Sequence, residues 1–169
     1  QFYYNQMSII YSPKQIKANK TENKGFGIFA AEQILVGTVF LKFEGPLINW
    51  SDIDDNSPAY KDDYMQVNKD LYINIANQSS VLINHSCNPN SIVIIESQEA
   101  YLKAVETISS NEEITYDYSL NWFDDDSKLF IPECLCGKDN CRKSVTSFNM
   151  IPKELADKYI ERGLVPEWL

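Results

Sequence analysis

The sequence predicts a mainly β protein of the α+β class, with several small sheets and one short helix near the C-terminus. The chain has 169 residues, of which 44% are hydrophobic and 12% aromatic, enough to build the core of one compact domain. Its apolar stretches are short, rich in β-branched and aromatic residues, and separated by polar breaks, which is typical of strands. Signals that start a helix occur in only two places.

Five runs have the composition of strands. They are residues 38–43, 71–75, 91–96, 100–105 and 113–118. Ser97, Gln98 and Glu99 separate the third run from the fourth and indicate a hairpin turn. Gly37 and Asn111 each stand at a polar break before a strand, where glycine and sometimes asparagine adopt a positive φ. We expect turns at both positions.

Two segments carry helix signals. The pair at 57–58, Ser-Pro, is consistent with the start of a short helix. Pro152 lies at a first-turn position and Gly163 at a stop position, which predicts a helix between them. In that helix Leu155 and Tyr159 are four residues apart and share a face, which we expect to pack on the domain.

The charge of the chain constrains its partners. A net charge of -9 and a pI of about 4.6 argue against direct nucleic-acid binding, which needs clustered Lys and Arg, and favour a basic partner. Acidic clusters at 52–55, 62–63 and 124–126 indicate either a solvated face or substrate steering. The longest apolar runs, such as 92–95, are too short to span a bilayer, and no secretion signal is evident. We expect an intracellular protein with no membrane segment.

Four cysteines are spaced like the ligands of a metal site. Cys134, Cys136 and Cys141 lie within eight residues, and Cys87 stands far upstream. Structural zinc usually takes four protein ligands, and Cys87 completes a four-thiolate set with no cysteine left over. We predict one structural Zn²⁺ per chain. Two alternatives remain: a pair of disulfides, or unrelated reduced cysteines in the core.

The segment 84–90, NHSCNPN, is dense in polar side chains and directly follows an apolar run. Buried polar groups need partners, so this segment is unusual for a plain loop. His85 is the only histidine of the chain. It is either a hydrogen-bonded structural residue or a residue in contact with a ligand.

Three separated motifs occur in one order: KGFGIFA at 24–30, NHSCNPN at 84–90 and EEITYDY at 112–118. With these motifs the chain resembles the SET-domain lysine methyltransferases, and the cysteines at 134, 136 and 141 resemble the post-SET tail of that family. The resemblance covers residues from about 24 to 141. It implies a fold of small sheets with a threaded, knot-like core where the Asn84 and Tyr118 segments meet, an exception to the usual avoidance of threading.

The resemblance also implies an organisation along the chain. An N-terminal segment, 1–20, precedes the SET domain, 21–120. A post-SET zinc segment, 121–149, and a C-terminal helix and tail, 150–169, follow and pack on the same domain. The zinc ligands implied are Cys87, Cys134, Cys136 and Cys141.

The implied cofactor is S-adenosylmethionine. Positions matching the family's cofactor-binding residues are Lys24, Gly25, Phe26, Gly27, Asn84 and His85. The missing side chains of the two glycines would let the backbone approach the methionine part of the cofactor. The amide of Asn84 would bind polar cofactor groups, and the backbone of this segment would lie near the adenine.

Two tyrosines match the family's catalytic positions. Tyr118 would orient the amine and the methyl group with its hydroxyl, because methyl transfer needs an in-line approach rather than a strong base. Tyr116, expected on the same strand face, occupies the Phe/Tyr position that sets how many methyl groups are added. A tyrosine there predicts mono- or dimethylation. Tyr64 is a further candidate for the lysine channel.

Several alternatives stay open. Trp122 and Phe123 either line the substrate channel or pack beneath the tail, and we favour packing. The substrate is expected to be a basic lysine-containing protein, histone or non-histone, and the enzyme a free-standing monomer. A different class of function, a catalytically silent SET fold serving as a zinc-stabilised peptide-binding scaffold, is separated from the enzyme by whether the chain binds the cofactor.

Overall fold

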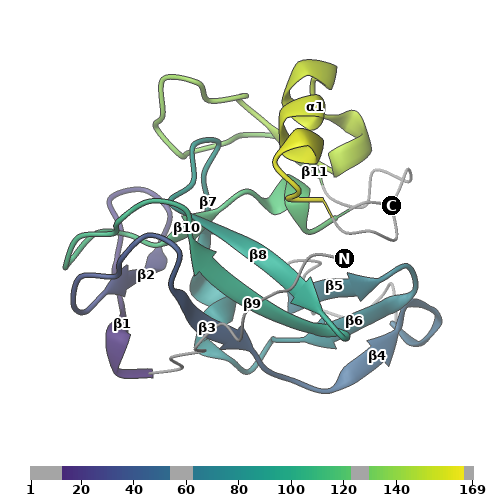
Figure 1. Ribbon diagram of the computed structural model, residues 1–169, viewed down its shortest axis with the longest axis horizontal. Helices are drawn as coiled ribbons and strands as arrows, with labels where there is room; N and C mark the ends of the chain where they lie inside the picture. Colours follow the sequence, from purple (N-terminus) through teal and green to yellow (C-terminus); the bar gives the residue numbers. More distant parts are fainter. Residues whose placement is uncertain (1–12, 54–62, 123–129, 166–169) are drawn as a thin grey trace.

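The computed structural model describes residues 13–53, 63–122 and 130–165. Within these ranges the chain forms five small sheets and one α-helix (Figure 1), which confirms the predicted mainly β class. The predicted helix at 57–58, Phe123 and most of the acidic clusters lie outside the described residues. No helix in the described part of the chain has both the length and the apolar character of a membrane span.

The described sheets are two of three strands, β3-β9-β8 and β4-β6-β5, and three pairs, β1-β2, β7-β10 and β11-β12. The strands are β1 (Ile16–Lys20), β2 (Phe26–Ala30), β3 (Val39–Phe43), β4 (Leu47–Asn49), β5 (Tyr64–Asn68), β6 (Leu71–Asn74), β7 (Asn84–His85), β8 (Ser91–Glu96), β9 (Glu99–Ala104), β10 (Thr115–Tyr116), β11 (Phe130–Ile131) and β12 (Val145–Thr146). All pairs are antiparallel except β7-β10, which is parallel.

Four of the five predicted strands are confirmed as β3, β6, β8 and β9, with ends shifted by at most one residue. Their turns are confirmed as well: Ser97 and Gln98 have φ of 52° and 67°, Gly37 has 85° and Asn111 has 68°. Strands β1, β2, β4, β5, β7, β11 and β12 were not predicted. Most of these are short or contain glycine or polar residues, so their composition does not resemble that of a buried strand.

The predicted strand at 113–118 is wrong over most of its length. Only Thr115 and Tyr116 form a strand, and a 3-10 helix, Tyr118–Leu120, begins two residues later. The Asp117 side chain accepts a hydrogen bond from the Ser119 N–H at 3.0 Å and caps this helix. Apolar and aromatic composition favours a strand here, but a local side-chain cap turns the chain instead.

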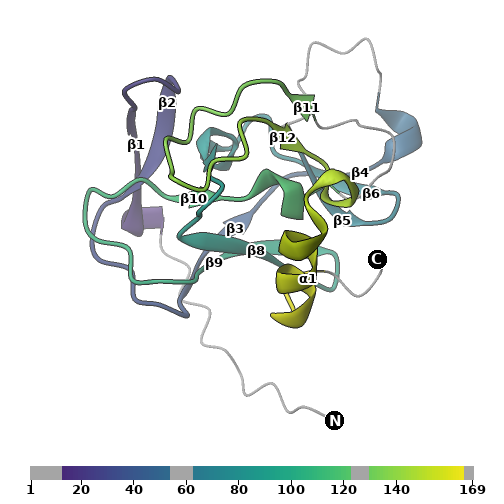
Figure 2. The ribbon, with the colours of Figure 1, turned by 90° about the horizontal axis from the view of Figure 1, so that it is seen from above.

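The main core lies between the sheets. Its buried members come from β2, β3, β5, β6, β8, β9, β10 and the loops between them, with Phe40, Phe43 and Leu102 among the largest. Figure 2 shows β1 and β2 at one side of the molecule and α1 at the other, with the segment between β11 and β12 running between them. The functional motifs are therefore supported from several small layers rather than one large sheet.

Helix α1 (Lys153–Glu161) confirms the C-terminal helix. Its first residue directly follows Pro152, and Gly163 behind its end has φ of 64°. Tyr159 is buried and Leu155 half-buried in a cluster with Ile92 of β8. The face predicted from the spacing is the face that packs.

Two segments that are far apart in the sequence pair in the middle of the molecule. β7 runs parallel to β10, with Asn84 opposite Thr115 and His85 opposite Tyr116. Buried Asn90 reinforces the pairing, since its side chain donates to the Glu113 carbonyl at 2.8 Å and accepts the Thr115 N–H at 3.0 Å. The meeting of the Asn84 and Tyr118 segments that the resemblance implies is present.

Candidate active site

Residues 24–27, which we call the glycine segment, are held against β7 and the residues before β10 by side-chain hydrogen bonds. Asn84 Nδ2 donates to the Phe26 carbonyl at 3.0 Å and to Glu113 Oε1 at 2.9 Å. The other oxygen of Glu113 accepts Lys24 Nζ at 2.7 Å. The Phe26 side chain is exposed, so this residue contributes its carbonyl. Three residues at predicted cofactor positions, Lys24, Phe26 and Asn84, thus form one connected group through Glu113, which was not predicted from the sequence.

The two glycines of this segment serve different physical needs. A Cβ on Gly27 would lie 2.8 Å from Glu113 Oε1, 2.9 Å from Asn84 Nδ2 and 2.9 Å from a Thr21 methyl. These contacts are closer than a real Cβ tolerates, so residue 27 needs hydrogen there. Gly25 has φ of 76° with nothing within 4 Å of a Cβ, so its requirement is the left-handed backbone.

The predicted catalytic tyrosines lie together beside His85. The ring centroids of Tyr116 and Tyr118 are 4.9 Å apart, and those of His85 and Tyr118 are 5.4 Å apart. The Tyr118 hydroxyl donates to the Ile83 carbonyl at 2.7 Å. Tyr118 opens the 3-10 helix and does not share a strand face with Tyr116, which corrects the expectation, although the two rings still meet.

The tautomer of His85 follows from its contacts. Its Nδ1 accepts the Tyr118 N–H at 3.2 Å, so the ring proton of the neutral form is on Nε2, which lies 3.3 Å from Cys87 Sγ. Burial lowers the pKa of His85 to about 4, against the opposing effect of Asp117, so the ring is neutral at pH 7. His85 therefore bridges the Tyr118 backbone and the cysteine cluster.

The four cysteines meet as predicted. All four Sγ atoms lie within 4.8 Å of one another, and those of Cys87 and Cys134 are 3.8 Å apart. Zinc with bonds of about 2.3 Å to sulfur gives a tetrahedral edge of about 3.8 Å, so the spacing fits that metal. None of the four cysteines forms a disulfide, and their convergence argues against unrelated core thiols. The donor set fits a closed structural zinc site.

The electrostatics of the cluster also favour a cation. Burial raises the pKa of the Cys87 thiol to about 11 and raises that of Cys134. Burial acts in the same direction on Cys136, but backbone N–H donors, those of Cys87 and Lys138, lower its pKa to about 7. Four thiolates this close repel one another, and a bound dication removes that repulsion and deprotonates the remaining thiols.

Asp117, between the two tyrosines in the chain, has a buried carboxylate and was not predicted as a site residue. Asp117 is 1% exposed, and Arg142 binds it with both guanidinium arms at 2.7 Å each. The Tyr159 hydroxyl donates to the same carboxylate at 2.8 Å. Asp117 stands inside the EEITYDY motif and Arg142 directly follows Cys141, so the sequence held a signal for both residues. Nothing in the pattern around Tyr159 predicted its contact.

An aromatic cluster lies beneath the cysteine tail. Trp122 is 2% exposed and its ring lies 5.7 Å from that of Tyr72 and 6.1 Å from that of Trp50. Packing is thus the role of Trp122, as favoured from the sequence. Tyr64 is buried in the same cluster, and Tyr118 packs against it. Tyr64 therefore lies near the candidate site, and its role in a lysine channel stays a prediction.

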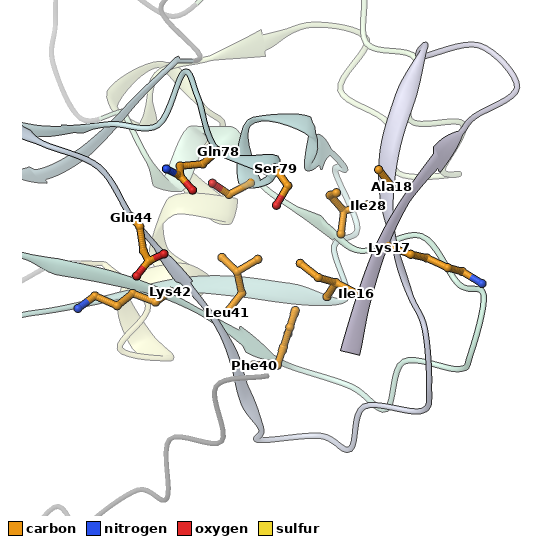
Figure 3. A pocket seen from close by; sticks show the side chains of 11 residues that line it. Ile16, Lys17, Ala18, Ile28, Phe40, Leu41, Lys42, Glu44, Gln78 and Ser79 are labelled. Carbon is orange, nitrogen blue, oxygen red and sulfur yellow. The ribbon is translucent and has the colours of Figure 1, made fainter. Parts of the chain in front are cut away.

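A separate pocket of about 150 Å³ lies between β1, β3 and the 3-10 helix at Ser79–Leu82 (Figure 3). Its apolar lining comes from Ile16, Ile28, Phe40 and Leu41. None of the residues predicted from the sequence as site residues lines it. The pocket is therefore distinct from the tyrosine and cysteine groups.

Comparison with known proteins identifies the class of the chain. The SET domain family matches residues 25–119, and the chain belongs to this family. It is 30% identical over 144 residues to the variant-silencing SET domain-containing protein of Plasmodium falciparum (isolate 3D7), covering 76% of this chain and 6% of that protein. It is 33% identical over 151 residues to the histone-lysine N-methyltransferase SETD1B of Homo sapiens, covering 82% of this chain and 7% of that protein. The chain thus spans only a small part of these relatives.

Solved structures share the fold. KRYPTONITE, crystallised with mCHH DNA, an H3(1-15) peptide and SAH, matches with a TM-score of 0.60 and 23% identity, covering 77% of this chain and 29% of that chain. SUVH6 of Arabidopsis thaliana in complex with SAM matches with a TM-score of 0.62 and 22% identity, covering 76% of this chain and 32% of that chain. At these identities the likeness supports the SET fold.

Proposed function

We propose that the chain transfers a methyl group from S-adenosylmethionine to the ε-amine of a lysine in a protein substrate. The observation that carries the proposal is the parallel β7-β10 pairing, which brings Asn84, His85 and Tyr118 together beside the glycine segment. Relatives that are named histone-lysine N-methyltransferases support the same activity. The catalytically silent scaffold has no observation in its favour here.

The cofactor-binding roles follow from the contacts. The Asn84 amide nitrogen donates to both Phe26 and Glu113, so the amide oxygen is the atom that accepts from a cofactor donor group. Lys24 and Glu113 hold the backbone of Gly25 to Gly27 in place for close approach. His85 contributes mainly by orienting Tyr118, whose backbone N–H it accepts. Bound S-adenosylmethionine supplies a methyl group on a sulfonium sulfur, and its transfer to the lysine nitrogen leaves S-adenosylhomocysteine and a proton.

Tyr118 is proposed as the catalytic residue. The Tyr118 hydroxyl uses its proton in the hydrogen bond to the Ile83 carbonyl. The lone pairs of its oxygen therefore remain for weak C–H···O contacts with the methyl group. The lysine must attack as the neutral amine, which costs on the order of 4 kcal/mol at pH 7.4 for a free lysine, and burial near a sulfonium charge lowers that cost. The tyrosine orients and does not need to act as a strong base.

Tyr116 is proposed to limit the number of methyl groups. It is buried, and its ring neighbours those of Tyr118 and Phe43. The ring centroids of Tyr116 and Phe43 are 6.2 Å apart in an edge-on arrangement. A hydroxyl at this position retains a water or restricts rotation of the amine. We therefore propose mono- or dimethylation as the outcome.

The four cysteines are proposed to hold one structural Zn²⁺ with no open coordination position. Cys87 would anchor the metal to the cofactor segment, and Cys134, Cys136 and Cys141 would anchor it to the tail. His85 Nε2 lies 3.3 Å from Cys87 Sγ and would donate to that thiolate as an outer hydrogen bond, the kind of contact that orients a metal ligand.

For the substrate we propose a basic, lysine-containing protein, with histone tails as the first candidates because of the names of the relatives. The acidic chain suits such a partner. An intracellular location, with the nucleus favoured, follows from that proposal. The sequence-based expectation that nucleic acid is not a partner has no support from the fold comparison, since KRYPTONITE was crystallised with DNA.

The test is methyl transfer from tritiated S-adenosylmethionine to histone peptides, peptide arrays and cell extract, with Tyr118→Phe as the matched control. We expect labelled lysine with the wild-type chain and a loss of at least about 100-fold in the variant, consistent with loss of an orienting group. Calorimetry with S-adenosylhomocysteine should show binding by both proteins. No binding by the wild type would reject the enzyme and leave the scaffold.

A further inference from the structure

The carboxylate of Asp117 has a hydrogen-bond donor for each of its lone-pair positions. Oδ1 accepts from Arg142 at 2.7 Å and from the Ser119 N–H at 3.0 Å, while Oδ2 accepts from Arg142 at 2.7 Å and from Tyr159 at 2.8 Å. An ionised carboxylate offers about four such positions. The group, which we call the Asp117 network, is therefore saturated, and its position is determined by three separate segments of the chain.

The Asp117 network acts directly on the backbone of Tyr118. Asp117 precedes Tyr118, and its side chain caps the 3-10 helix that Tyr118 begins. The Tyr118 N–H donates to His85 Nδ1, which lies 3.5 Å from Asp117 Oδ1. A rotation of the carboxylate would therefore shift both the cap and the peptide unit from which the Tyr118 side chain projects.

Tyr159 reaches this carboxylate from a part of the chain beyond the residues matched by the SET domain family, 25–119. It is 6% exposed, and its helix is held by a cluster with Ile92 and Ile151. Burial and the neighbouring Asp117 raise the pKa of the Tyr159 phenol, so the hydroxyl stays protonated and donates at neutral pH. Its ring packs, and its hydroxyl adds a directional contact that packing alone does not need.

We propose that Tyr159 of helix α1 is a positioning residue for the reaction, because its hydroxyl fixes the Asp117 carboxylate and thereby the placement of Tyr118. This inference rests on the proposed methyltransferase function. When the hydroxyl is absent, the carboxylate keeps Arg142 and Ser119 but loses the second donor to Oδ2, and with it the contact that ties the carboxylate to helix α1. Small displacements of an orienting group reduce the rate of the chemical step more than they reduce binding.

The test is Tyr159→Phe, which keeps the ring and removes one oxygen. We expect kcat at saturating substrates to fall about tenfold, with little change in KM for S-adenosylmethionine or in zinc content. Independently of activity, the backbone amide signals of Tyr118 and Ser119 in ¹H–¹⁵N spectra should move, since both report on the capped turn. Wild-type kcat together with unmoved signals would overturn the inference.

Leu155→Ala is the matched control, because Leu155 lies on the same helix face and makes only apolar contacts in its cluster. It should lower Tm while kcat per folded molecule and the two amide signals stay near wild type. If both variants lost activity in proportion to their loss of Tm, the role of Tyr159 would be structural and the inference wrong. If the wild type transferred no methyl group, the proposed function would fail, and the amide signals would still decide whether Tyr159 positions Tyr118.

Discussion

Gly25 and Gly27 are separated by one residue and have unrelated reasons to be glycine. Gly25 needs a backbone conformation, since its φ is 76° and the space around a Cβ is open. Gly27 needs the absence of atoms, because Asn84 and Glu113 meet over its Cα. The same substitution at the two positions therefore has different consequences.

Gly27→Ala is expected to separate the Asn84 and Glu113 side chains and to weaken cofactor binding at least about tenfold, with a loss of about 1–3 kcal/mol in unfolding free energy from overpacking. Gly25→Ala should cost about 1–2 kcal/mol of backbone strain and affect the cofactor less. Calorimetry with S-adenosylhomocysteine and urea unfolding measure the two effects. Equal cofactor affinity of the Gly27 variant and the wild type would contradict the crowding argument.

Tyr116 offers a second prediction at the scale of one residue. Tyr116→Phe removes the hydroxyl of a buried tyrosine and keeps the ring that lies against Tyr118, so the amine gains space to rotate after the first transfer. Mass spectra of product peptides should shift towards higher methylation states at similar total turnover. An unchanged distribution would exclude Tyr116 as the residue that sets product multiplicity.

At the scale of elements, the tail between β11 and β12 is joined to the rest mainly through Cys87 and Arg142. The Cys87 sulfur accepts the Arg142 N–H at 3.4 Å, and its carbonyl accepts the Asn140 side chain at 3.1 Å. Short strand pairs of two residues contribute little stability by themselves. The order of this tail is therefore expected to depend on the metal.

Zinc removal should accordingly disorder the tail and weaken cofactor binding before the β-rich body unfolds, because zinc binding of roughly 10–16 kcal/mol couples to local folding. Cys136→Ser is expected to lose the metal and at least about tenfold in cofactor affinity. The neighbouring Leu135→Ser, at a half-exposed position that provides no ligand, is the control and should retain both. Metal analysis measures the zinc content, and calorimetry measures the cofactor affinity. A metal-free variant with full cofactor affinity would show that cofactor binding does not depend on the metal.

At the scale of the whole molecule, the Asp117–Arg142 pair joins the EEITYDY motif to the tail between β11 and β12. Tyr159 connects the C-terminal helix to the same carboxylate. Burial acts to raise the pKa of Asp117, but the Arg142 guanidinium outweighs it and holds that pKa below its ordinary value of 3.8. Removing one partner of such a pair leaves the other charge buried and uncompensated, which typically costs about 3–5 kcal/mol.

Asp117→Asn should therefore destabilise the chain by about 3–5 kcal/mol at pH 7. Folding lowers the pKa of Asp117, so the stability that its ionised carboxylate contributes is fully present above the unfolded pKa near 4. That stability is lost as the pH falls below this value towards the folded pKa. Urea unfolding of both proteins at pH 7, 5, 4 and 3 should show a constant difference down to about pH 5 that narrows below pH 4. A difference that stays the same at pH 3 would mean that the carboxylate charge is not its source.

Prediction from the sequence succeeded where local signals and long-range packing agree. The hairpin at Ser97 and Gln98 and the helix ending before Gly163 have turn and stop residues that act within a few positions. It failed at residues 113–118, because the capping carboxylate of Asp117 is itself held by residues far along the chain. The short strands escaped prediction because pairing partners rather than composition stabilise them.

The sequence by itself determined the family, the fold class, the four cysteines and those candidate site residues that lie in the family motifs, such as Asn84, His85 and Tyr118, since these depend on residue types at set spacings. Only the tertiary structure decided which side chains touch and which further residues join them: that Glu113 joins Lys24 to Asn84, that His85 faces both Tyr118 and Cys87, and that Tyr159 reaches Asp117. Such contacts join residues up to 89 positions apart, and hydrogen bonds at that separation leave no periodic pattern in the chain.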